Sequence, residues 1–388
     1  MSEVMRPSTL DARAHPLPRI VYVVPEDWYF ASHCQTIAQA ARAAGFEIHV
    51  AANATEEGAA NIRGQGFTPH AIRFRRGKLS PFRMLRTVLA LRRLYRAVDP
   101  AIVHHVTLRL TLLGIVASFG FKFAAVHAIG GLARRFITPR AGRPLRRASR
   151  LVLRRGLNSH RAMALVQSPE DRDVLTGLGV EPQHIALIPG SGIDSDRCRP
   201  IPEPDGPVTV AFAGRMVTDK GIRTLIEAQR ILLDSGIHSE LLLAGTPDPA
   251  DPTSIPQIEV AGWGREPGIT WLGYVDDIAA VWRRAHIAVL PARCGDGVPK
   301  SLLEAAAFGR PLIATDVPGC REIVIHEKTG LLVPVDDPGA LAAAILRLVR
   351  SPAQRVRYGV AARRLIDERF AADLVGRATV ALYRSLLT

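Results

Sequence analysis

Two carboxylates, Asp296 and Glu304, lie eight positions apart in the segment GDGVPKSLLEAAAFGRP (295–311). Pro299 is typical of a first helical residue, and Gly309 with the proline that follows it is typical of a helix end. We therefore expect a short helix that carries Glu304. Asp296 would lie in the loop before this helix, free to point into a cleft.

The first turn of this predicted helix combines a cation with a carboxylate. Lys300 and Ser301 lie four and three residues before Glu304, so the three side chains share one helix face. The free N–H groups of this turn favour an anion. The carboxylate of Glu304 can accept hydrogen bonds from two hydroxyl groups, such as those of a ribose. The alternative interpretation of Glu304 is an ordinary exposed helix glutamate.

A second cationic segment, GRMVTDKG (214–221), follows the predicted strand VTVAFA. Arg215 and Lys220 flank a short loop that opens a helix, where backbone N–H groups and two positive charges make an anion site. Their separation of five residues suits a diphosphate better than a single charge. The alternative is a pair of surface cations in a loop.

Both segments need a sheet edge to bring them together, and the apolar runs of the chain predict one. Short runs rich in valine and isoleucine alternate with helical stretches, as in parallel sheets covered on both faces. The runs form two groups, separated at CRPIPEPDGP (198–207), where proline, acid and glycine cluster. We expect strands at 19–24, 46–52, 101–105 and 123–129, and then at 208–214, 239–245, 269–273, 286–292, 310–315 and 329–335.

This pattern predicts an α/β protein of two doubly wound domains that face each other across a cleft, where ligands bind at the carboxyl ends of the strands. The first domain should span about 19–190 and the second about 200–370. A helix over about 372–388 should pack back on the first domain. The first 18 residues are mixed polar and proline-containing, so we expect them to be disordered.

Net charge is distributed unevenly between the two halves of the chain. The total is +14, but residues 1–169 hold 26 Lys and Arg against 8 Asp and Glu, a net charge of +18, and the rest carries −4. No acid lies between Asp99 and Glu170. Two basic amphipathic helices are expected here, with arginines at 83, 86, 92, 93 and 96 in the first and at 134, 135, 140, 143, 146, 147, 150, 154 and 155 in the second.

We expect these basic helices to meet an anionic membrane surface. The alternative is a solvated arginine-rich face. Nucleic acid is not an expected partner, because no helix-turn-helix, zinc-finger or aromatic RNA-binding pattern accompanies the charge. The longest uncharged apolar run, 110–121, is shorter than the roughly 20 residues that a spanning helix needs.

The expected location is the cytoplasm, with peripheral association to the inner face of the plasma membrane. No signal peptide is visible in the first 18 residues. The four cysteines lie far apart, without the spacing of a zinc site or a disulfide framework, which fits a reducing compartment.

The segments quoted above resemble the C-terminal signature of the retaining glycosyltransferases of family 4, whose GT-B fold consists of two Rossmann-like domains. The resemblance rests on GRMVTDKG, DGVPKSLLEAAAFGRPLIATDVPGCREIV and TGLLVPVDD, and it is strongest over 208–335. It extends to EDWYFASH (26–33), HAIGGL (127–132) and IPGSGID (188–194). Within the family the chain is most similar to bacterial enzymes that build capsule, O-antigen or other glycan chains on undecaprenyl diphosphate.

The resemblance implies a donor site for a nucleotide sugar, UDP-linked, in the second domain. Arg215 and Lys220 would contact the donor diphosphate, Glu304 the ribose, and Asp296 the donor sugar. Asp296 is one methylene shorter than the glutamate usual in the family. Backbone groups near Tyr274 and Val275 would recognise the base, and the remaining donor-binding residues would be Gly214, Lys300, Ser301 and Leu302.

In the first domain the resemblance implies that His127 contacts the donor sugar or its phosphate. Gly130 and Gly131 beside it allow a close approach of the backbone to a ligand. The catalytic residues would thus be Asp296, His127, Lys220 and Arg215, whereas we interpret His104 and His105 as structural. A polar cluster of Glu26, Asp27 and His33 would lie on the acceptor side, together with the two glycines.

We expect no cofactor and no metal, because the cations and the helix start can stabilise the charge that develops on a leaving diphosphate. Two D-x-D strings, at 171–173 and 194–196, are interpreted as a helix surface and a turn. The resemblance implies transfer with retention by a front-face path to a lipid-linked acceptor. Two alternatives stay open: a sugar-nucleotide epimerase on the same fold, and a non-catalytic basic protein that binds membrane surfaces.

Overall fold

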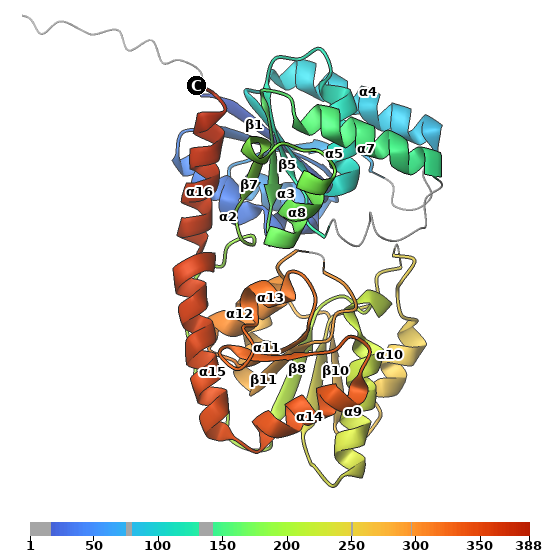
Figure 1. Ribbon diagram of the computed structural model, residues 1–388, viewed down its shortest axis with the longest axis vertical. Coiled ribbons are helices and arrows are strands. Elements are labelled where there is room, and N and C mark those ends of the chain that lie inside the picture. The colour runs from blue at the N-terminus through green and yellow to red at the C-terminus, as the bar shows by residue number, and fades with distance from the viewer. Residues whose placement is uncertain (1–16, 75–79, 132–142, 250, 296) are drawn as a thin grey trace, which may run out of the picture.

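The computed structural model describes residues 17–74, 80–131, 143–249, 251–295 and 297–388, with the backbone alone for 143–146. Two α/β domains are stacked along the long axis of the molecule, the first above the second in Figure 1. Some predictions lie outside the described residues: Asp296, the arginines at 134, 135 and 140, and the expected disorder of 1–16.

The first domain is built on a seven-stranded parallel sheet with the strand order β3-β2-β1-β4-β5-β6-β7. β1 is an inner strand, between β2 and β4, and the run Ile20 to Val24 within it is fully buried because helices cover both faces of the sheet. The strands are β1 Arg19–Glu26, β2 Glu47–Asn53, β3 Thr68–Ala71, β4 Ile102–Val106, β5 Ala124–Ala128, β6 Ala162–Val166 and β7 Ile185–Leu187.

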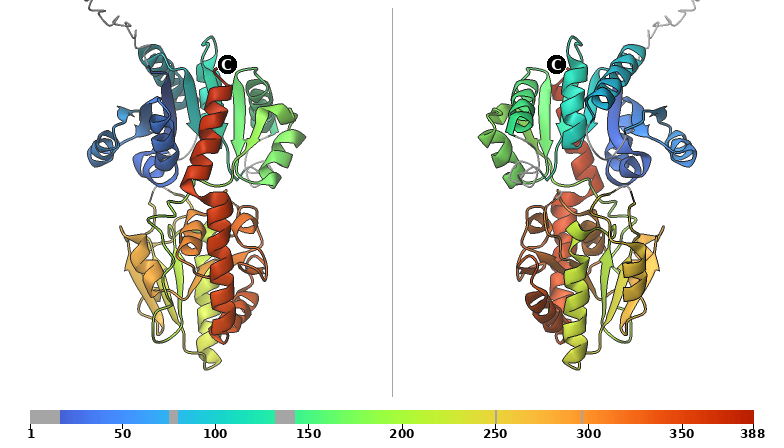
Figure 2. Two further views of the ribbon diagram at one scale, coloured as in Figure 1. Left: turned by 90° about the vertical axis from the view of Figure 1, so that its left-hand side faces the viewer. Right: turned by 90° about the vertical axis from the view of Figure 1, so that its right-hand side faces the viewer.

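Seven α-helices are described in the first domain, and on one face of its sheet α5 packs between α4 and α7 (Figure 2). Ser168 caps α8 by accepting a hydrogen bond from the N–H of Asp171, and Thr55 caps α3 in the same way through Gly58. The helices are α1 Asp27–His33, α2 Gln35–Ala43, α3 Glu56–Gly64, α4 Pro81–Val98, α5 Leu108–Ser118, α7 Arg143–Leu157 and α8 Pro169–Gly177.

The second domain contains a six-stranded parallel sheet with the order β10-β9-β8-β11-β12-β13. Its strands are β8 Thr209–Ala213, β9 Glu240–Ala244, β10 Ile269–Gly273, β11 Ile287–Leu290, β12 Leu312–Thr315 and β13 Gly330–Val333. Its helices are α9 Ile222–Asp234, α10 Gln257–Trp263, α11 Ile278–Arg284, α12 Lys300–Ala307, α13 Cys320–Ile323, α14 Pro338–Val349 and α15 Pro352–Leu365.

In both sheets the strand order reverses beside the first strand, between β1 and β4 and between β8 and β11. These switch points are where ligands bind in doubly wound sheets, and the two carboxyl edges face each other. The prediction of two Rossmann-like domains is confirmed. All six strands predicted in the second domain are present, whereas β3, β6 and β7 of the first were not predicted.

The chain passes between the domains twice, and the two crossings are hydrogen-bonded to each other. The N–H of Ile193 donates to the carbonyl of Phe370 at 2.8 Å, and the N–H of Ala372 donates to the carbonyl of Ile193 at 2.8 Å. After the second crossing, α16 (Ala372–Ser385) runs up the first domain and packs against α2, as Figures 1 and 2 show.

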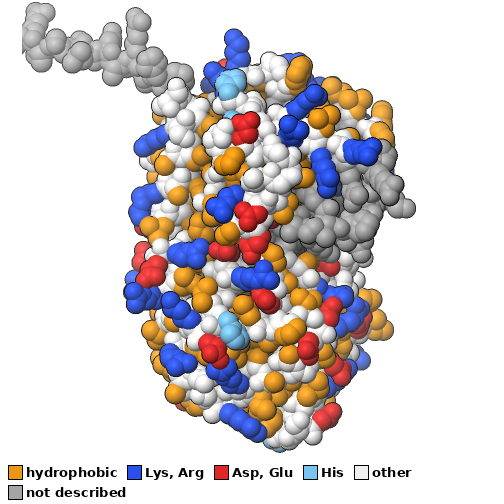
Figure 3. Space-filling model, viewed as in Figure 1, with side chains coloured by type: hydrophobic (Ala, Val, Ile, Leu, Met, Phe, Trp, Pro, Cys, Tyr) orange, Lys and Arg blue, Asp and Glu red, His pale blue; other side chains and the backbone are white. Residues whose placement is uncertain are grey.

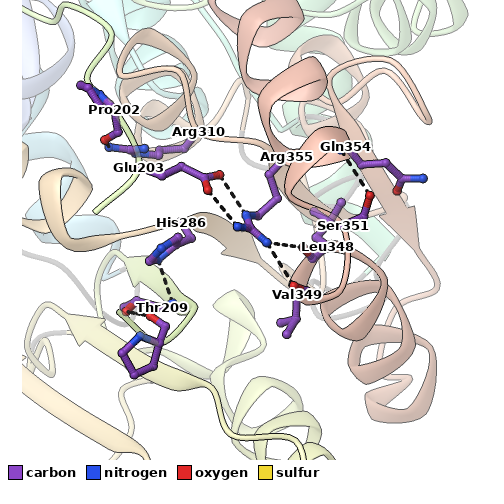
Figure 4. Close-up of polar contacts among 11 residues, drawn as sticks. Pro202, Glu203, Thr209, His286, Arg310, Leu348, Val349, Ser351, Gln354 and Arg355 are labelled. Carbon is purple, nitrogen blue, oxygen red and sulfur yellow. Dashed lines mark hydrogen bonds and ion pairs between the residues drawn. The ribbon is translucent and has the colours of Figure 1, made fainter. Parts of the chain in front are cut away.

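The segment 198–207, where the sequence predicted the domain boundary, is fixed to the second domain by two arginines (Figure 4). We call this segment the linker. Arg310 is 1% exposed and donates through Nη2 to the carbonyl of Pro202 at 2.8 Å. Arg355 forms a two-pronged ion pair with Glu203, with N···O distances of 2.9 and 2.8 Å. Such paired donors fix both position and orientation, so the linker has a defined path beside α15.

Candidate active site

A cavity of about 530 Å³ lies between the two domains. Its lower wall comes from the carboxyl edge of the second sheet, including the loop after β8 and the start of α12. Its upper wall comes from β1, α1, β4 and β5 of the first domain. Of the described residues that line it, the charged ones are Arg215, Lys220, Lys300 and Glu304, and all four belong to the second domain.

The start of α12 brings Lys300, Ser301 and Glu304 to the cavity. Lys300 Nζ lies 3.7 Å from Glu304 Oε1, one helical turn along the same face. Helical periodicity turns the other residues of α12 into the core, so Leu302 is 1% exposed and does not line the cavity. Its side chain therefore cannot contact a ligand there, and the prediction that Leu302 binds the donor remains only for its backbone N–H in the first turn of α12.

Burial alters the acidity of Glu304. The side chain is 15% exposed, and the loss of solvation raises the pKa of its carboxyl to about 7, with a smaller opposing effect from Lys300. At neutral pH the group is poised between its two protonation states. A ligand that donates hydrogen bonds to the carboxylate would favour the ionised state.

Lys300 also connects the two domains. Its Nζ donates to the carbonyl oxygen of Ser32 at the end of α1, at 2.6 Å, and lies 3.4 Å from Ser32 Oγ. Nearby, the N–H of Val298 donates to Gln167 Oε1 at 3.0 Å. Gly297 has φ +90°, a backbone conformation that favours glycine, and a Cβ there would lie 2.5 Å from the same Gln167 oxygen and displace that side chain.

Arg215 lines the cavity and is held by two carboxylates that the sequence interpretation missed. Its Nη1 donates to Asp248 Oδ2 at 3.0 Å and to Asp251 Oδ2 at 2.8 Å. Both acids lie in the loop after β9, at the carboxyl edge of the sheet. The repeat DPADPT (248–253) at that position was a usable signal. Two carboxylates thus compensate the charge of Arg215 in this state. Lys220 is the second cation of the loop after β8 to line the cavity.

The upper wall is neutral and rich in aromatic rings. Trp28, Tyr29 and His33 of α1 line it, and the rings of Tyr29 and His33 stack with centroids 4.3 Å apart. Burial lowers the pKa of His33 to about 4, with further lowering by Lys300, Lys220 and Arg215 across the cavity. His33 is therefore an uncharged imidazole at neutral pH.

Asp27 and Glu26 do not line the cavity, which corrects their assignment to the acceptor side. Asp27 is 8% exposed, and its Oδ2 accepts from the N–H and the hydroxyl of Thr55, both at 2.7 Å. Glu26 accepts from Asn53 Nδ2 at 2.8 Å. Both carboxylates attach the start of α1 to neighbouring segments, so they position the wall instead of forming it.

The structure also corrects the choice among the first-domain histidines. His127 on β5 is 1% exposed, stacks on His105 with ring centroids 5.0 Å apart, and does not line the cavity. Side chains alternate along a strand, and His127 pairs with His105, whose ring contacts Tyr95 of α4 on the far face of the sheet. His104, interpreted as structural from the sequence, lies on the opposite face and lines the cavity.

The remaining candidates divide between the cavity and its surroundings. Gly214 and Gly130 line it, but Gly131 does not, and its N–H donates to Asp171 Oδ2 at 3.2 Å. In the first D-x-D string the prediction of a helix surface is wrong for Asp171, which is 2% exposed, and confirmed for Asp173, which is exposed on α8. Tyr274 is 74% exposed and, like Val275, lies outside the lining, which reaches Ile278 instead.

Among the residues that the structure describes, no group of three or more His, Cys, Asp or Glu side chains is arranged to hold a metal ion. None of the four cysteines forms a disulfide, and three of them line the cavity: Cys34, Cys294 and Cys320.

Comparison with known proteins agrees with this geometry. Two family profiles match the chain: one described as "Glycosyltransferase Family 4" over residues 31–197, and one described as "Glycosyl transferases group 1" over residues 207–351. The chain belongs to the family 4 glycosyltransferases. The first profile includes the upper-wall residues from Ser32 onward, and the second includes the charged residues of the lower wall, so the two matches reach both sides of the cavity.

Individual relatives place this family 4 chain among bacterial enzymes. It is 25% identical to the capsular polysaccharide biosynthesis glycosyltransferase CapM of Staphylococcus aureus over 46% of each chain. It is 28% identical to the alpha-D-kanosaminyltransferase of Streptomyces kanamyceticus over 68% of this chain and 64% of that one. The matched part thus spans about half to two thirds of the length of these two curated relatives.

Among solved structures, the fold resembles that of Anabaena Alr3699/HepE in complex with UDP-glucose. The TM-score is 0.75, the sequence identity is 15%, and the match covers 95% of this chain and 99% of that one. At this identity the likeness establishes the GT-B fold, with two domains and a cleft between them.

Proposed function

We propose that the protein is a glycosyltransferase that moves a sugar from a UDP-linked donor to a lipid-linked glycan acceptor, with retention, in bacterial capsule or exopolysaccharide biosynthesis. The observation that carries this proposal is the chemical contrast inside one cavity. One wall offers cations, a helix start and a buried carboxylate, and the other offers uncharged aromatic and histidine side chains.

The charged wall suits a nucleoside diphosphate. Lys220 and Lys300 can bind the two phosphates, aided by the free N–H groups at the start of α12. Glu304 lies one turn inside that helix and can accept hydrogen bonds from the two ribose hydroxyls. Arg215 can join them through its Nε and Nη2 atoms, because both ion pairs with the acids of the β9 loop use Nη1.

These groups also suit the chemistry of transfer. When the bond between the anomeric carbon and the diphosphate breaks, negative charge grows on the leaving oxygen. Fixed cations beside that oxygen stabilise the transition state more than the ground state. In the front-face path that the family resemblance implies, the leaving phosphate oxygen accepts the proton of the acceptor hydroxyl, and the new bond forms on the same face of the sugar.

The choice of UDP and of a polysaccharide pathway is supported by the relatives. HepE has been solved with UDP and with UDP-glucose, and CapM is named for capsular polysaccharide biosynthesis. Undecaprenyl diphosphate as the carrier of the acceptor follows from the resemblance to enzymes that build such glycans.

A surface on α4 supports an acceptor held at a membrane. Phe82, Leu85 and Leu89 are 66%, 55% and 42% exposed and share one helix face. Exposed Arg83 and Arg86 flank them, and the Arg86 guanidinium lies 5.5 Å from the ring centroid of Phe82. Apolar residues between arginines are typical of a helix that lies in the interface of an anionic bilayer.

Figure 3 shows apolar and basic side chains together in the region where Figure 1 places α4 and α7. Within the described residues, no helix combines the length and apolar character needed to cross a membrane. We therefore propose peripheral binding through α4. Vesicle flotation should show binding to vesicles that contain phosphatidylglycerol, and a Phe82→Ser/Leu85→Ser/Leu89→Ser variant should lose it. Equal flotation of both proteins would contradict this part of the proposal.

A screen of nucleotide sugars for thermal stabilisation tests the function. A ligand that binds the native state raises the melting temperature once its concentration exceeds its dissociation constant. We expect stabilisation by UDP and by at least one UDP-sugar, unaffected by a metal chelator. Release of UDP from that UDP-sugar should then depend on added polyprenyl-linked acceptor. Interconversion of UDP-sugars without UDP release would indicate an epimerase instead.

A further inference from the structure

Three side chains from distant parts of the sequence form a hydrogen-bonded chain behind the upper wall of the cavity. The hydroxyl of Tyr22 on β1 lies 2.9 Å from that of Tyr383 on α16, and the latter lies 2.5 Å from Nδ1 of His104 on β4. Tyr22 and Tyr383 are fully buried and His104 is 2% exposed. The rings of Tyr22 and His104 stack with centroids 5.0 Å apart, and both residues line the cavity.

The protons of this chain can be assigned by counting donors and acceptors. Burial raises the pKa of both tyrosines, so both hydroxyls keep their protons. Burial also lowers the pKa of His104 to about 3, with a smaller contribution from His127, so the imidazole is neutral. A neutral imidazole has one N–H donor and one acceptor nitrogen.

Only one order of donation uses every proton. Among the described residues, Tyr22 Oη has no hydrogen-bond partner other than Tyr383 Oη. Tyr22 therefore donates to Tyr383, and Tyr383 donates to Nδ1 of His104. The reverse order would leave the buried proton of Tyr22 without an acceptor. The single N–H of His104 is thus on Nε2, for which the described part of the chain provides no acceptor.

The place of His104 in the sheet gives this N–H a role. β1 and β4 are the two strands at the switch point of the first sheet, where ligands bind in doubly wound folds. The surrounding wall is uncharged and includes the rings of Trp28 and Tyr29. Such a wall suits a pyranose, whose C–H faces pack on aromatic rings and whose hydroxyl oxygens accept hydrogen bonds. A phosphate would find its cations on the opposite wall.

We propose that His104 is a sugar-binding residue whose Nε2–H donates to a pyranose hydroxyl oxygen in the cavity, and that Tyr383 is a positioning residue that holds this tautomer. The C-terminal helix α16 thereby takes part in sugar binding. This inference rests on the proposed function for its ligand, but the tautomer is a property of the protein alone. The sugar is either the one carried by the donor or the one that receives it.

The chain offers a matched control for Tyr383. On the other face of the same sheet, the hydroxyl of Tyr95 lies 2.7 Å from Nε2 of His105, and both residues are fully buried. Neither lines the cavity. Tyr383→Phe and Tyr95→Phe each remove the hydroxyl from a buried Tyr–His pair. The Tyr383 hydroxyl makes two hydrogen bonds and that of Tyr95 one, so Tyr383→Phe should cost more stability, and both variants are compared where they are folded. Only Tyr383→Phe should alter sugar binding.

The first measurement is ¹⁵N NMR of the full-length protein labelled at histidine, with His104 assigned by its absence in His104→Gln. We expect the Nε2–H tautomer, with no titration above pH about 4. Tyr383→Phe should populate the second tautomer, whereas Tyr95→Phe should leave the His104 signals unchanged. A wild-type His104 protonated on Nδ1 would overturn the proposal, whether or not the protein binds a nucleotide.

The second measurement compares His104→Leu with His104→Gln, which keeps an N–H donor near the position of Nε2. The probes are UDP, then UDP-glucose, UDP-galactose and UDP-N-acetylglucosamine, then octyl pyranosides of the same sugars added to the UDP-loaded protein. The loss of one hydrogen bond to a sugar should weaken binding about tenfold in His104→Leu, with recovery in His104→Gln and no change for UDP.

The pattern of losses identifies the source of the sugar. Weaker UDP-sugar binding alone indicates the donor sugar, and weaker pyranoside binding alone indicates the acceptor. Two results would overturn the proposal: equal sugar binding by wild type and both variants, or a wild type that binds UDP but neither prefers a UDP-sugar to UDP nor binds any pyranoside. Failure to bind UDP at all would instead contradict the proposed function.

Discussion

The more basic half of the chain supplies the uncharged wall of the cavity, and the slightly acidic half supplies the wall that carries the cations. The first domain comes from the half of the chain with a net charge of +18, yet its described cavity residues include no Lys, Arg, Asp or Glu. The second half has a net charge of −4 and supplies Arg215, Lys220, Lys300 and Glu304. The positive charge of the first domain lies instead on outer helices such as α4.

This difference shows that the net charge of a domain does not indicate the charge of the binding site that it forms. The excess arginines concern which surface the protein approaches, since they act over roughly a Debye length and without specific geometry. The few cations at the cavity concern which ligand binds, since they are fixed by strand ends and a helix start. On this account the lower wall holds the nucleotide diphosphate and the upper wall holds sugar.

The assignment of the nucleotide to the lower wall predicts that Glu304→Ala lowers UDP affinity more than any other single substitution considered. The variant removes an acceptor of two hydrogen bonds from the ribose, and hydrogen bonds to a charged group contribute about 1.5–3 kcal/mol each. UDP affinity measured by calorimetry should fall on the order of several hundredfold. Glu240→Ala, which removes an exposed glutamate at the start of β9, is the control and should bind UDP as wild type does.

Lys220→Ala should have the next largest effect, because it removes a charge-assisted contact to the diphosphate while Arg215 remains compensated by its two acids. We expect UDP affinity to fall about tenfold to a hundredfold. Lys328→Ala removes an exposed positive charge of the same domain outside the cavity and serves as the control. Equal losses in both variants would mean that general electrostatics, and not the site, drives binding.

The pH dependence of donor binding should follow Glu304. Its pKa is raised to about 7, so below neutral pH the carboxyl is increasingly protonated and loses the capacity to accept from both ribose hydroxyls. Affinity for UDP-glucose should therefore fall as pH drops below about 7, approaching tenfold per pH unit. UDP-glucose is the better probe, since its diphosphate has no terminal phosphate that titrates in this range. Glu304→Gln should bind more weakly and without this pH dependence.

The raised pKa of Glu304 also makes the stability of the ligand-free protein depend on pH. A carboxyl whose pKa is higher in the folded than in the unfolded state binds its proton more tightly when folded. Its contribution to stability is therefore greatest at low pH and is lost as pH rises from about 4.5 to about 7. The difference in melting temperature between Glu304→Gln and wild type should accordingly grow over that interval.

The smallest expected effect is a gain in affinity. Asp248→Asn keeps the shape of the side chain but removes one of the two charges that hold Arg215, which is 39% exposed in its side chain. Partly exposed ion pairs contribute up to about 1 kcal/mol, so UDP affinity should rise by about two- to fivefold. A lower affinity would show that the acids of the β9 loop position Arg215 for the ligand and do not compete with it.

The sequence predicted the lower wall well because its signals are local. The start of α12 follows from Pro299, its end from Gly309 with φ +75°, and the shared face of Lys300 and Glu304 from helical spacing. Pro299 itself is the residue just before the helix rather than its first one. The partners of Arg215 were missed, although the Asp-Pro repeat after β9 lies at the same sheet edge.

The upper wall was predicted poorly because its signals are not local. Tyr383 and His104 are 279 positions apart in the chain and meet only because α16 returns to the first domain. The sequence pointed to His127 instead of His104 because Gly130 and Gly131 beside it would let a ligand approach. Side chains alternate between the two faces of a strand, however, and the register of β5 places His127 on the face away from the cavity. A single sequence does not show which face of a doubly covered strand meets the cleft.

The most direct test of the two-wall account is UDP affinity, measured by calorimetry for wild type, Lys220→Ala and His104→Leu. UDP has a diphosphate but no transferred sugar, so it should probe the lower wall alone. The account predicts at least a tenfold loss in Lys220→Ala and a change of less than about twofold in His104→Leu. Comparable losses in both variants, or an unchanged affinity in Lys220→Ala, would contradict it.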